Sequence, residues 1–425
     1  MSTIVLPEET RSGLCLWQQC LIFFCVCALW VTRRPDAIFH AQFWAEDGRE
    51  FFGDAYSVGP WTALFRPYGG YFHVVPRLGA SLTLLFPLSL APLVLNLIAI
   101  VIQALPVNIL LLSRSSVLGS VRYRALLAAI YLALPNSGEL TAIITNSQCL
   151  LALSAFLLIV AATSRSLTGR IFDIFLLLLS GLSGPYCIFL LPIALFLAWK
   201  HCERWRWAGV GAIAASCLVQ AWGLLIVSPS ARPHYSLGAS PSLLARILAG
   251  QVYVATLFGS NNLAARSGPW FSVLLFFVAV GGTAIVATCF VKSALEMKLF
   301  ILLSSMVLAA SLISPTAPPS ARASVWELLT RANGVHYWFF PTLAFAWSLL
   351  WCFHCRVVAL KAVSAVLLCL MCFGIVHDWR YPAFKDLHFA EYAKRFESAP
   401  VGTAVTIPEN PEGWNMRLVK RPASK

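Results

Sequence analysis

Four of the chain's acidic residues stand close together shortly after its first apolar segment: Glu46, Asp47, Glu50 and Asp54. The sequence of 425 residues holds only 18 acidic residues, and between positions 55 and 377 only five more occur. A reaction that takes a proton from a hydroxyl group needs a general base, which a carboxylate supplies. The acidic group is therefore the first place in this chain to expect such chemistry.

Aromatic and basic side chains frame the acidic group. Trp44 precedes it, and a turn-rich stretch with Tyr68, Tyr71 and His73 follows and ends at Arg77. Aromatic rings can stack on the faces of a sugar, and a guanidinium can stabilise the charge that develops on a phosphate leaving group. These residue types suit a site that holds a sugar donor with a polar head and a lipid tail.

A structural role for the acids is the alternative interpretation. Glu46 and Asp47 precede a segment with helical spacing, where an acidic residue can cap the helix and complement its dipole. Capping accounts for one acid more readily than for an acidic pair followed by a histidine and an arginine. Polar residues at other turns are further candidates for substrate binding, the two arginines among them for a lipid phosphate: Glu139, Asn146, Gln148, Arg266, Arg331 and His336.

The composition indicates a membrane protein. Hydrophobic residues make up 59% and charged residues 12% of the chain, and the mean hydropathy is +0.76. A soluble domain cannot bury that much apolar surface, whereas a bilayer accepts helices of ~20 apolar residues. We predict an all-α polytopic fold with about 10–12 transmembrane helices. The apolar windows are Leu14–Val31, Pro92–Leu112, Gln148–Ala162, Ile171–Leu182, Ile188–Trp199, Ala208–Val227, Trp270–Val291, Leu299–Ile313, Trp338–Phe353 and Val357–Ile375, with Pro76–Leu90 and Tyr123–Leu134 as shorter candidates.

The first loop and the C-terminal tail have local patterns of their own. Arg49–Tyr56 and Trp61–Phe65 are predicted as short amphipathic helices that lie on the membrane interface. The tail has helical spacing from Phe389 to Phe396, followed by two short strands around residues 402–408 and 414–419. We therefore divide the chain into a transmembrane domain, residues 1–376 with a first outer loop at 34–75, and a small extracytoplasmic α/β tail, residues 377–425. The tail either covers the mouth of a site or only completes the chain.

Basic residues predict which loops face the cytoplasm. Lys and Arg residues lie in several of the loops that follow predicted spans, and basic loops of this kind remain on the cytoplasmic side. The loops Asn136–Asn146, Ser183–Pro185, Ser228–Gly268 and Ser314–Val335 then face outward. We call the first loop, residues 34–75, the acidic loop. The side of the membrane on which it lies depends on Pro76–Leu90: a full span places the loop inside, and a segment that dips into the membrane and returns places it outside.

Other functions are less consistent with the sequence. The net charge of +13 does not indicate nucleic-acid binding, because the basic residues are spread over many loops. The pairs Cys352/Cys355 and Cys369/Cys372 have metal-like spacing but lie in or next to spans, so we expect no metal site. A transporter or flippase of a lipid-linked or polar solute is the alternative function. It would need charges within spans or an internal repeat; Asp173 is the only acid near a span centre, and we find no repeat.

Three stretches of the sequence resemble motifs of a group of poorly characterised bacterial membrane proteins. They are Trp-Ala-Glu-Asp-Gly at Trp44–Gly48, Pro-Tyr-x-Gly-Tyr-x-His-x-x-Pro-Arg at Pro67–Arg77, and Ile-Pro-x-Asn-Pro-x-Gly-Trp-x-Met at Ile407–Met416. The order of first span, acidic loop, juxtamembrane helices and aromatic-Pro-Arg entry is similar to that of the GT-C superfamily of integral-membrane glycosyltransferases. The Lys-Pro-Pro signature of some GT-C enzymes is absent.

The resemblance implies a function and roles for particular residues. It implies transfer of a sugar from a polyprenyl-phosphate donor to a glycan, lipid or protein acceptor at the outer face of the cytoplasmic membrane. The catalytic acid of the family corresponds to Asp47, with Glu46 as the second choice, and the residue for the lipid phosphate corresponds to Arg77. No metal and no cofactor besides the lipid-linked sugar are implied, and the expected partners are membrane lipids, donor and acceptor.

Overall fold

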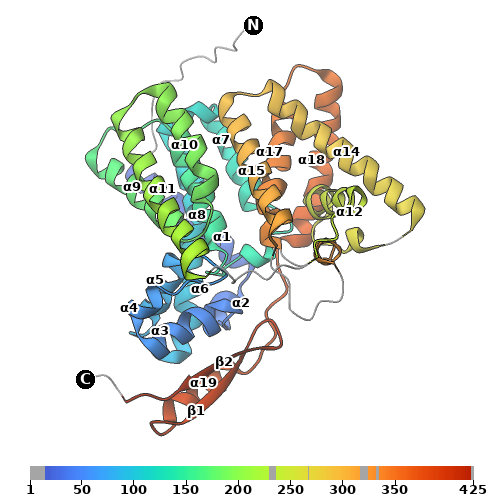
Figure 1. The fold of residues 1–425 in the computed structure, drawn as a ribbon. Coiled ribbons are helices and arrows are strands. Elements are labelled where there is room, and N and C mark those ends of the chain that lie inside the picture. The colour runs from blue at the N-terminus through green and yellow to red at the C-terminus, as the bar shows by residue number, and fades with distance from the viewer. Residues whose placement is uncertain (1–14, 229–235, 267, 316–323, 332–334, 423–425) are drawn as a thin grey trace.

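Helices that run side by side form the body of the computed structural model, and a small tail lies at one end of them (Figure 1). The structure describes residues 15–228, 236–266, 268–315, 324–331 and 335–422. Among these residues, seven helices are long and apolar enough to cross a membrane, judged by length and composition. The prediction of an all-α polytopic fold with a small α/β tail is confirmed. The seven are Leu16–Arg33, Leu88–Leu111, Arg204–Val227, Pro241–Phe258, Pro269–Lys292, Leu295–Ile313 and Val358–Asp378.

Each of the ten longer apolar windows corresponds to a helix. The long helices are α1 (Leu16–Arg33), α6 (Ala91–Leu111), α11 (Arg204–Trp222), α14 (Pro269–Lys292), α15 (Leu295–Ile313) and α18 (Val358–Asp378). The shorter ones are α8 (Ser147–Val160), α9 (Leu167–Leu182), α10 (Cys187–His201) and α17 (Phe339–Phe353). A further helix, α7 (Val121–Leu132), corresponds to the shorter candidate window Tyr123–Leu134.

Two of the shorter helices form the centre of the fold. Every residue of α8 is buried, and α17 is buried along nearly its whole length. A helix that is apolar on all sides needs apolar neighbours on all sides. Here α8 packs against α6, α9 and α10, while α17 packs against α7, α14, α15 and α18. The outer helices expose apolar side chains, such as Phe277 of α14 at 65% and Val376 of α18 at 79%, as helices in contact with lipid do.

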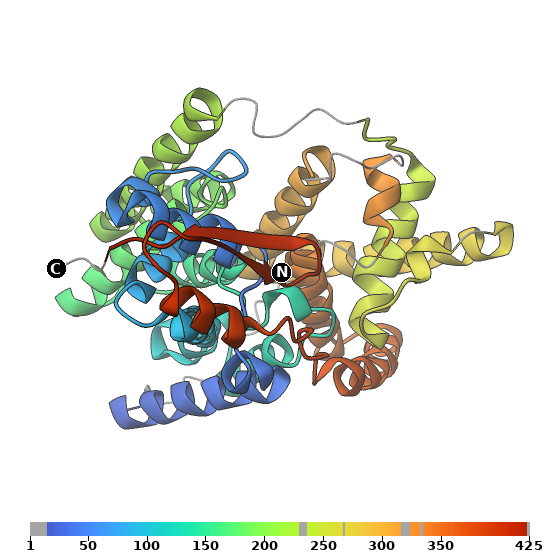
Figure 2. The ribbon, with the colours of Figure 1, turned by 90° about the horizontal axis from the view of Figure 1, so that it is seen from below.

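One helix corrects the sequence prediction. Residues 228–268 were predicted as an outward loop, but Pro241–Phe258 is an apolar helix, with α12 (Pro241–Ile247), a π-helical stretch (Leu248–Val254) and α13 (Ala255–Phe258). Figure 2 shows this yellow-green helix along its length, so it runs crosswise to the upright helices of Figure 1. It holds few charges over 18 residues, as a membrane span requires.

The segment that decides the position of the acidic loop does not form a full span. Short helices α2 (Asp36–Phe39), α3 (Gly53–Val58) and α4 (Pro60–Leu64) lead to α5 (Val74–Thr83), which has only 10 residues. A helix rises ~1.5 Å per residue, so α5 is about half as long as the apolar core of a bilayer is thick. The chain then turns through Leu88–Leu90 into α6. The acidic loop and the tail consequently lie at the same end of the molecule (Figure 1).

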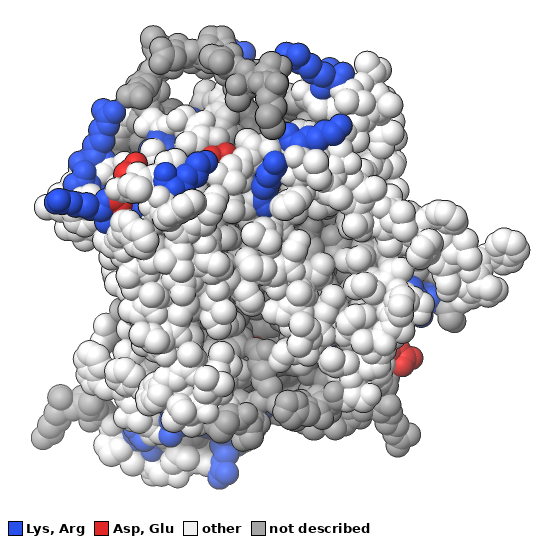
Figure 3. Space-filling view, turned by 45° about the horizontal axis from the view of Figure 1, so that its top comes forward, with Lys and Arg blue, Asp and Glu red and all other residues white. Residues whose placement is uncertain are grey.

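The opposite end is basic. Figure 3 shows Lys and Arg side chains gathered there, above a largely uncharged middle. Lys200 stands in the last turn of α10 and Lys292 in the last turn of α14. The sequence predicted these connections as basic loops, and the fold brings them together.

The tail packs on the acidic loop. It contains α19 (Phe389–Ser398) and the antiparallel strands β1 (Ala404–Glu409) and β2 (Trp414–Val419), in the register Val405 to Leu418 and Ile407 to Met416. The inward side chains of the strands share an apolar cluster with Phe43 and Phe52 of the loop. The faces of the loop that we predicted to lie on the membrane interface are therefore buried in protein at residues 51, 52 and 55. A further short helix, α16 (Val325–Leu329), lies next to α12.

Arg33 joins three helices at the end that carries the acidic loop. It is 1% exposed and stands at the end of α1. Its guanidinium donates to Leu132 O (2.8 Å), Leu134 O (2.9 Å), Asp378 O (3.2 Å) and the Tyr381 hydroxyl (2.9 Å). The next residue, Arg34, is 6% exposed, and its Nε and Nη1 have no hydrogen-bond partner among the described residues.

This contrast gives a paired prediction. We expect Arg33→Met to lower the free energy of unfolding by about 3 kcal/mol or more, because it leaves several buried oxygens unpaired. Arg34→Met should cost less, about 1 kcal/mol, because Arg34 contacts the rings of Phe384 and Tyr381 but binds no buried carbonyl oxygens as Arg33 does. Equilibrium unfolding in detergent micelles measures both. A larger loss for Arg34→Met than for Arg33→Met would contradict the assignment.

Candidate functional site

Asp47 is buried where the acidic loop meets the central helix α8. It begins a π-helix, Asp47–Phe52, and is 1% exposed. Its Oδ1 accepts hydrogen bonds from the backbone N–H of Thr145 (3.0 Å) and from the Thr145 hydroxyl. Thr145 lies two residues before α8, so this carboxylate ties the loop to the centre of the fold.

The surroundings of Asp47 raise the pKa of its carboxyl group towards neutral pH. Burial raises the pKa of the Asp47 carboxyl to about 7, and the charge of Glu46 adds to that effect, while the hydrogen bonds from Thr145 oppose it. A general base is most effective when its pKa lies near the working pH. Asp47 thus has the protonation behaviour that the chemistry in question needs.

The backbone next to this contact has unusual geometry. Ala45, two residues before Asp47, has φ 42°, and Ala142, three residues before Thr145, has φ 58°. Residues with a Cβ atom seldom adopt these left-handed values, and they tend to occur at functional sites. Both outliers stand within three residues of the two partners of the Asp47–Thr145 contact. They support the interpretation of this contact as functional.

A second buried carboxyl group comes from the tail. Glu409, at the end of β1, is 1% exposed, and neither of its carboxyl oxygens has a hydrogen-bond partner among the described residues. It lies against Gly48: a Cβ atom on this glycine would stand 1.8 Å from Glu409 Oε1. Burial raises the pKa of Glu409 to about 9, and the charge of Asp47 raises it further. The two carboxyls therefore form one interacting acidic pair.

Backbone hydrogen bonds hold the tail in this position. The N–H of Ala45 donates to Asn410 O (2.5 Å), and the N–H of Asn410 donates to Phe43 O (3.2 Å). Trp44 stacks on Phe384, with ring centroids 4.7 Å apart. Trp44, a predicted substrate-binding residue, is thus engaged in docking the segment that leads to the tail.

The aromatic residues predicted for the site lie together beside Glu46. The hydroxyl of Tyr68 donates to Glu46 Oε1 (3.1 Å). His73 is 1% exposed, its Nε2 lies 3.3 Å from Tyr68 O, and its ring centroid is 4.6 Å from that of Tyr71. Glu46, in contrast to Asp47, is only partly buried.

Arg77 is buried within α5 and already has an acidic partner. Its Nη1 donates to Asp54 Oδ2 (3.0 Å), and its guanidinium lies 5.3 Å from the ring centroid of Phe51. Asp54 also binds Arg66, at 2.7 Å. A phosphate at Arg77 would have to share the guanidinium with Asp54, although the Arg77 Nε has no hydrogen-bond partner in the described part of the chain.

A second polar group lies next to Thr145. The side chain of Asn146 donates to Glu139 O (2.8 Å), and His336 Nδ1 lies 3.1 Å from Glu139 Oε2. Gln148, the second residue of α8, faces Gly184, where a Cβ atom would stand 2.4 Å from its Oε1. This group is linked to the Asp47 contact because Asn146 directly follows Thr145 in the chain.

Two predicted residues stand apart from the acidic pair. Arg266 and Arg331 have exposed side chains. Their backbone carbonyl oxygens accept hydrogen bonds from Arg246 (2.9 Å) and Gln251 (2.8 Å), respectively. These contacts belong to the region around the crosswise helix and do not involve the acidic loop.

A groove opens near the start of the acidic loop. Its volume is about 560 Å³, which is within the range of small-molecule sites. It is lined by Pro35, Asp36, Phe39, His40, Arg380, Tyr381, Pro382 and Ala383. No cluster of three or more His, Cys, Asp or Glu side chains suited to a metal ion occurs in the described ranges.

Sequence reasoning missed Thr145 and Glu409. Thr145 carries no signal by itself, since a threonine before a helix is common as a cap. Glu409 lies inside the tail motif Ile407–Met416, but its distance of 362 residues from Asp47 concealed the pairing. No protein-family model and no curated protein matches the chain.

The acidic pair makes docking of the tail dependent on pH. The folded-state pKa of Glu409 is raised, so its contribution to docking is complete below the ordinary carboxyl pKa and is lost as the pH rises through about 9. The charged groups around it are Asp47, Arg49 and Glu50. We expect amide hydrogen exchange of β1 and β2, corrected for intrinsic rates, to accelerate about tenfold or more between pH 6 and pH 9.5. Glu409→Gln should flatten this dependence; an equal acceleration in that variant would refute the assignment.

The contact at Gly48 gives a separate test. We expect Gly48→Ala to weaken tail docking by about 1–3 kcal/mol, because the new methyl group overlaps the Glu409 carboxyl. Limited proteolysis of the tail measures docking. The double variant Gly48→Ala/Glu409→Ala should recover part of the loss, since the overlap is gone. No recovery would show that the glycine matters for another reason.

Proposed function

We propose that the protein transfers a sugar from a polyprenyl-phosphate donor to a glycan, lipid or protein acceptor at the outer face of the cytoplasmic membrane. The observation that carries the proposal is the carboxyl group of Asp47, buried at the end opposite the basic loops, with a pKa raised to about 7. Its polytopic helical setting suits a donor with a long lipid tail. The basic end faces the cytoplasm in this proposal, as insertion favours.

The reaction assigns one proton and one leaving group. The acceptor hydroxyl gives its proton to Asp47, and its oxygen forms a bond to the anomeric carbon of the sugar. The bond from that carbon to the phosphate oxygen breaks, and polyprenyl phosphate leaves with the electron pair. Glu409 remains protonated while Asp47 is ionised, because its pKa is raised to about 9. The proton that the two carboxyl groups share thus stays on Glu409 and leaves Asp47 free to act as the base.

Other residues of the site hold the substrates in this proposal. Arg77 supports the lipid phosphate, with exchange of its bond to Asp54 as the donor binds. Glu46, partly buried and held by Tyr68, is the second choice for the base. The groove of about 560 Å³ beside α2 has room for the polar part of a donor or acceptor.

Access to Asp47 requires movement. With the tail docked, Asp47 is 1% exposed, so an acceptor reaches it only after the tail or the neighbouring loops separate. Closure of a site after substrate entry excludes water, which strengthens electrostatic contacts within it. The tail thus acts as a cover in the proposed cycle.

The direct test compares three variants with the wild type. We expect Asp47→Asn to lower the release of polyprenyl phosphate from polyprenyl-phosphate sugars by about 10²–10⁴-fold, since it removes the base but keeps the shape. Glu50→Gln is the matched control, because Glu50 lies in the same π-helix and pairs with Arg49, and it should retain activity. Radiolabelled donors in native-lipid membranes, with crude acceptor fractions, provide the assay.

The remaining outcomes are equally informative. Full activity of a folded Asp47→Asn protein, with loss in Glu46→Gln, would move the base to Glu46. Full activity in both variants would show that neither Glu46 nor Asp47 takes part in the chemistry. If the folded wild type turns over no donor in the presence of acceptor, the proposed transfer is wrong.

A further inference from the structure

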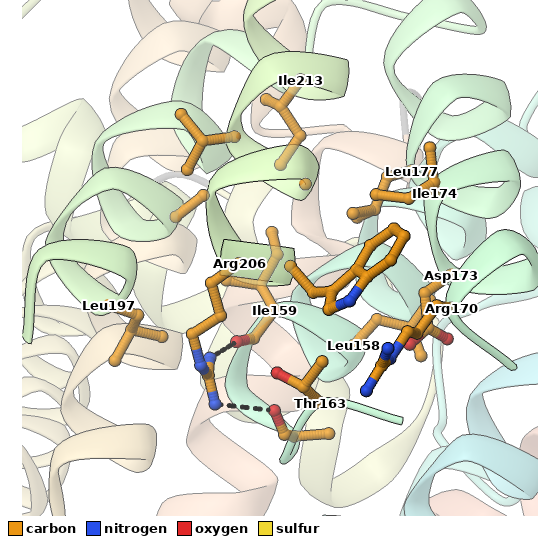
Figure 4. Close-up of a pocket in the computed structure, with 15 residues that line it drawn as sticks. Leu158, Ile159, Thr163, Arg170, Asp173, Ile174, Leu177, Leu197, Arg206 and Ile213 are labelled. Atoms are coloured by element: carbon orange, nitrogen blue, oxygen red, sulfur yellow. Dashed lines mark hydrogen bonds between the residues drawn. The ribbon is translucent and has the colours of Figure 1, made fainter. Parts of the chain in front are cut away.

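A small cavity lies at the basic end of the molecule, among α8, α9, α10 and α11. Its volume is about 50 Å³. Figure 4 shows Arg170 and Arg206 on either side of it, with Thr163 between them. Apolar side chains such as Leu177 and Ile213 complete the lining. The cavity therefore has polar groups along one edge and is apolar elsewhere.

Arg206 has a structural task at this cavity. Its Nη1 donates to Ile159 O (2.8 Å) and its Nη2 to Ala161 O (3.0 Å). These carbonyls lie at the end of α8, where the helix leaves them without partners of its own. Arg206 thus caps the central helix and places a fixed positive charge beside the cavity.

Arg170 is placed differently. Its Nε donates to Ser164 O (2.8 Å), and its guanidinium lies 5.0 Å from the ring centroid of Trp205. Within the described ranges, its two terminal nitrogens make no hydrogen bond. A guanidinium in this state offers paired donors to two oxygens of one phosphate group.

The acids near the cavity are already compensated. Asp173 receives two hydrogen bonds from Arg114, each 2.5 Å long. Glu203 accepts a hydrogen bond from Thr163, and its Oε2 lies 3.5 Å from Arg206 Nε. Each carboxylate therefore has a cationic or hydroxyl partner, and the charge of Arg170 is left for a ligand.

The neighbouring outer surface is apolar. On α9, Ile171 is 58% and Phe175 is 57% exposed. They extend from the cavity's helix into the region where acyl chains would lie. A ligand that satisfies both parts has an anionic head and a hydrocarbon tail.

We propose that this cavity binds one anionic phospholipid, with a phosphate oxygen on Arg170 and acyl chains along α9. The cavity itself receives only the phosphate region, as its small volume requires. Basic loops alone would arise from membrane insertion. They do not account for an arginine whose terminal nitrogens are left open above an apolar cavity. This inference concerns the end opposite Asp47 and does not depend on the proposed transfer reaction.

Native mass spectrometry of the full-length protein in detergent tests the proposal. The probes are phosphatidylglycerol, zwitterionic phosphatidylcholine and inorganic phosphate. We expect the wild type to prefer phosphatidylglycerol, and Arg170→Gln to weaken its binding about tenfold or more. Arg165→Gln is the matched control: it changes the net charge equally at an exposed position in the loop just before α9 and should bind as the wild type does. Arg170→Lys, which keeps the charge, should bind phosphatidylglycerol more weakly than the wild type and more tightly than Arg170→Gln.

Three results would overturn the proposal. One is an equal loss in Arg165→Gln and Arg170→Gln, which would indicate attraction to the surface charge as a whole. Another is saturation of the site by inorganic phosphate with no advantage for the lipid. The third is equal binding of both lipids by the wild type. Should Arg170→Gln fail to fold, the lipid preference and Arg170→Lys still decide.

Discussion

Two buried carboxyl groups that influence one another are the constraint on which the acidic-loop end of this protein depends. Asp47 comes from the first loop and Glu409 from the far end of the chain, and both are 1% exposed. A buried carboxylate is costly, and a second one beside it more so, hence the pair retains a proton near neutral pH. The absence of a side chain at Gly48 makes room for this arrangement.

The rest of the fold brings these two groups together. The central helix α8 is buried on all sides and can supply Thr145 as a fixed anchor for Asp47. The short helix α5 returns the chain to the side from which it came, so that loop and tail share one end of the molecule. Backbone hydrogen bonds between residues 45 and 410 then set the position of Glu409. The contacts of Asp47 with Thr145 and of residue 45 with residue 410 join residues that are far apart in the sequence.

The sequence predicts those features that depend on local patterns. Apolar windows located most of the long helices. The strands predicted around residues 402–408 and 414–419 lie close to the observed β1 and β2. The unusual density of acids pointed to the first loop, and the family resemblance singled out Asp47 within it. Glu409 was beyond reach, because pairing across the whole chain leaves no local trace. The crosswise helix at 241–258 was missed as a helix, because it is the least apolar of the seven long helices.

Glu409 is a buried acid that stays neutral near pH 7, because burial and, in addition, the charge of Asp47 raise its pKa. Infrared difference spectroscopy during a pH titration detects the C=O stretch of protonated carboxyl groups directly. We expect the wild type to show such a band at pH 8, when ordinary carboxyls are ionised, and Glu409→Gln to lack it. In Asp47→Asn the band should titrate at lower pH, since one charge that raises the pKa of Glu409 is removed. A wild-type spectrum without a protonated carboxyl at pH 8, or a band unchanged in Glu409→Gln, would contradict the account.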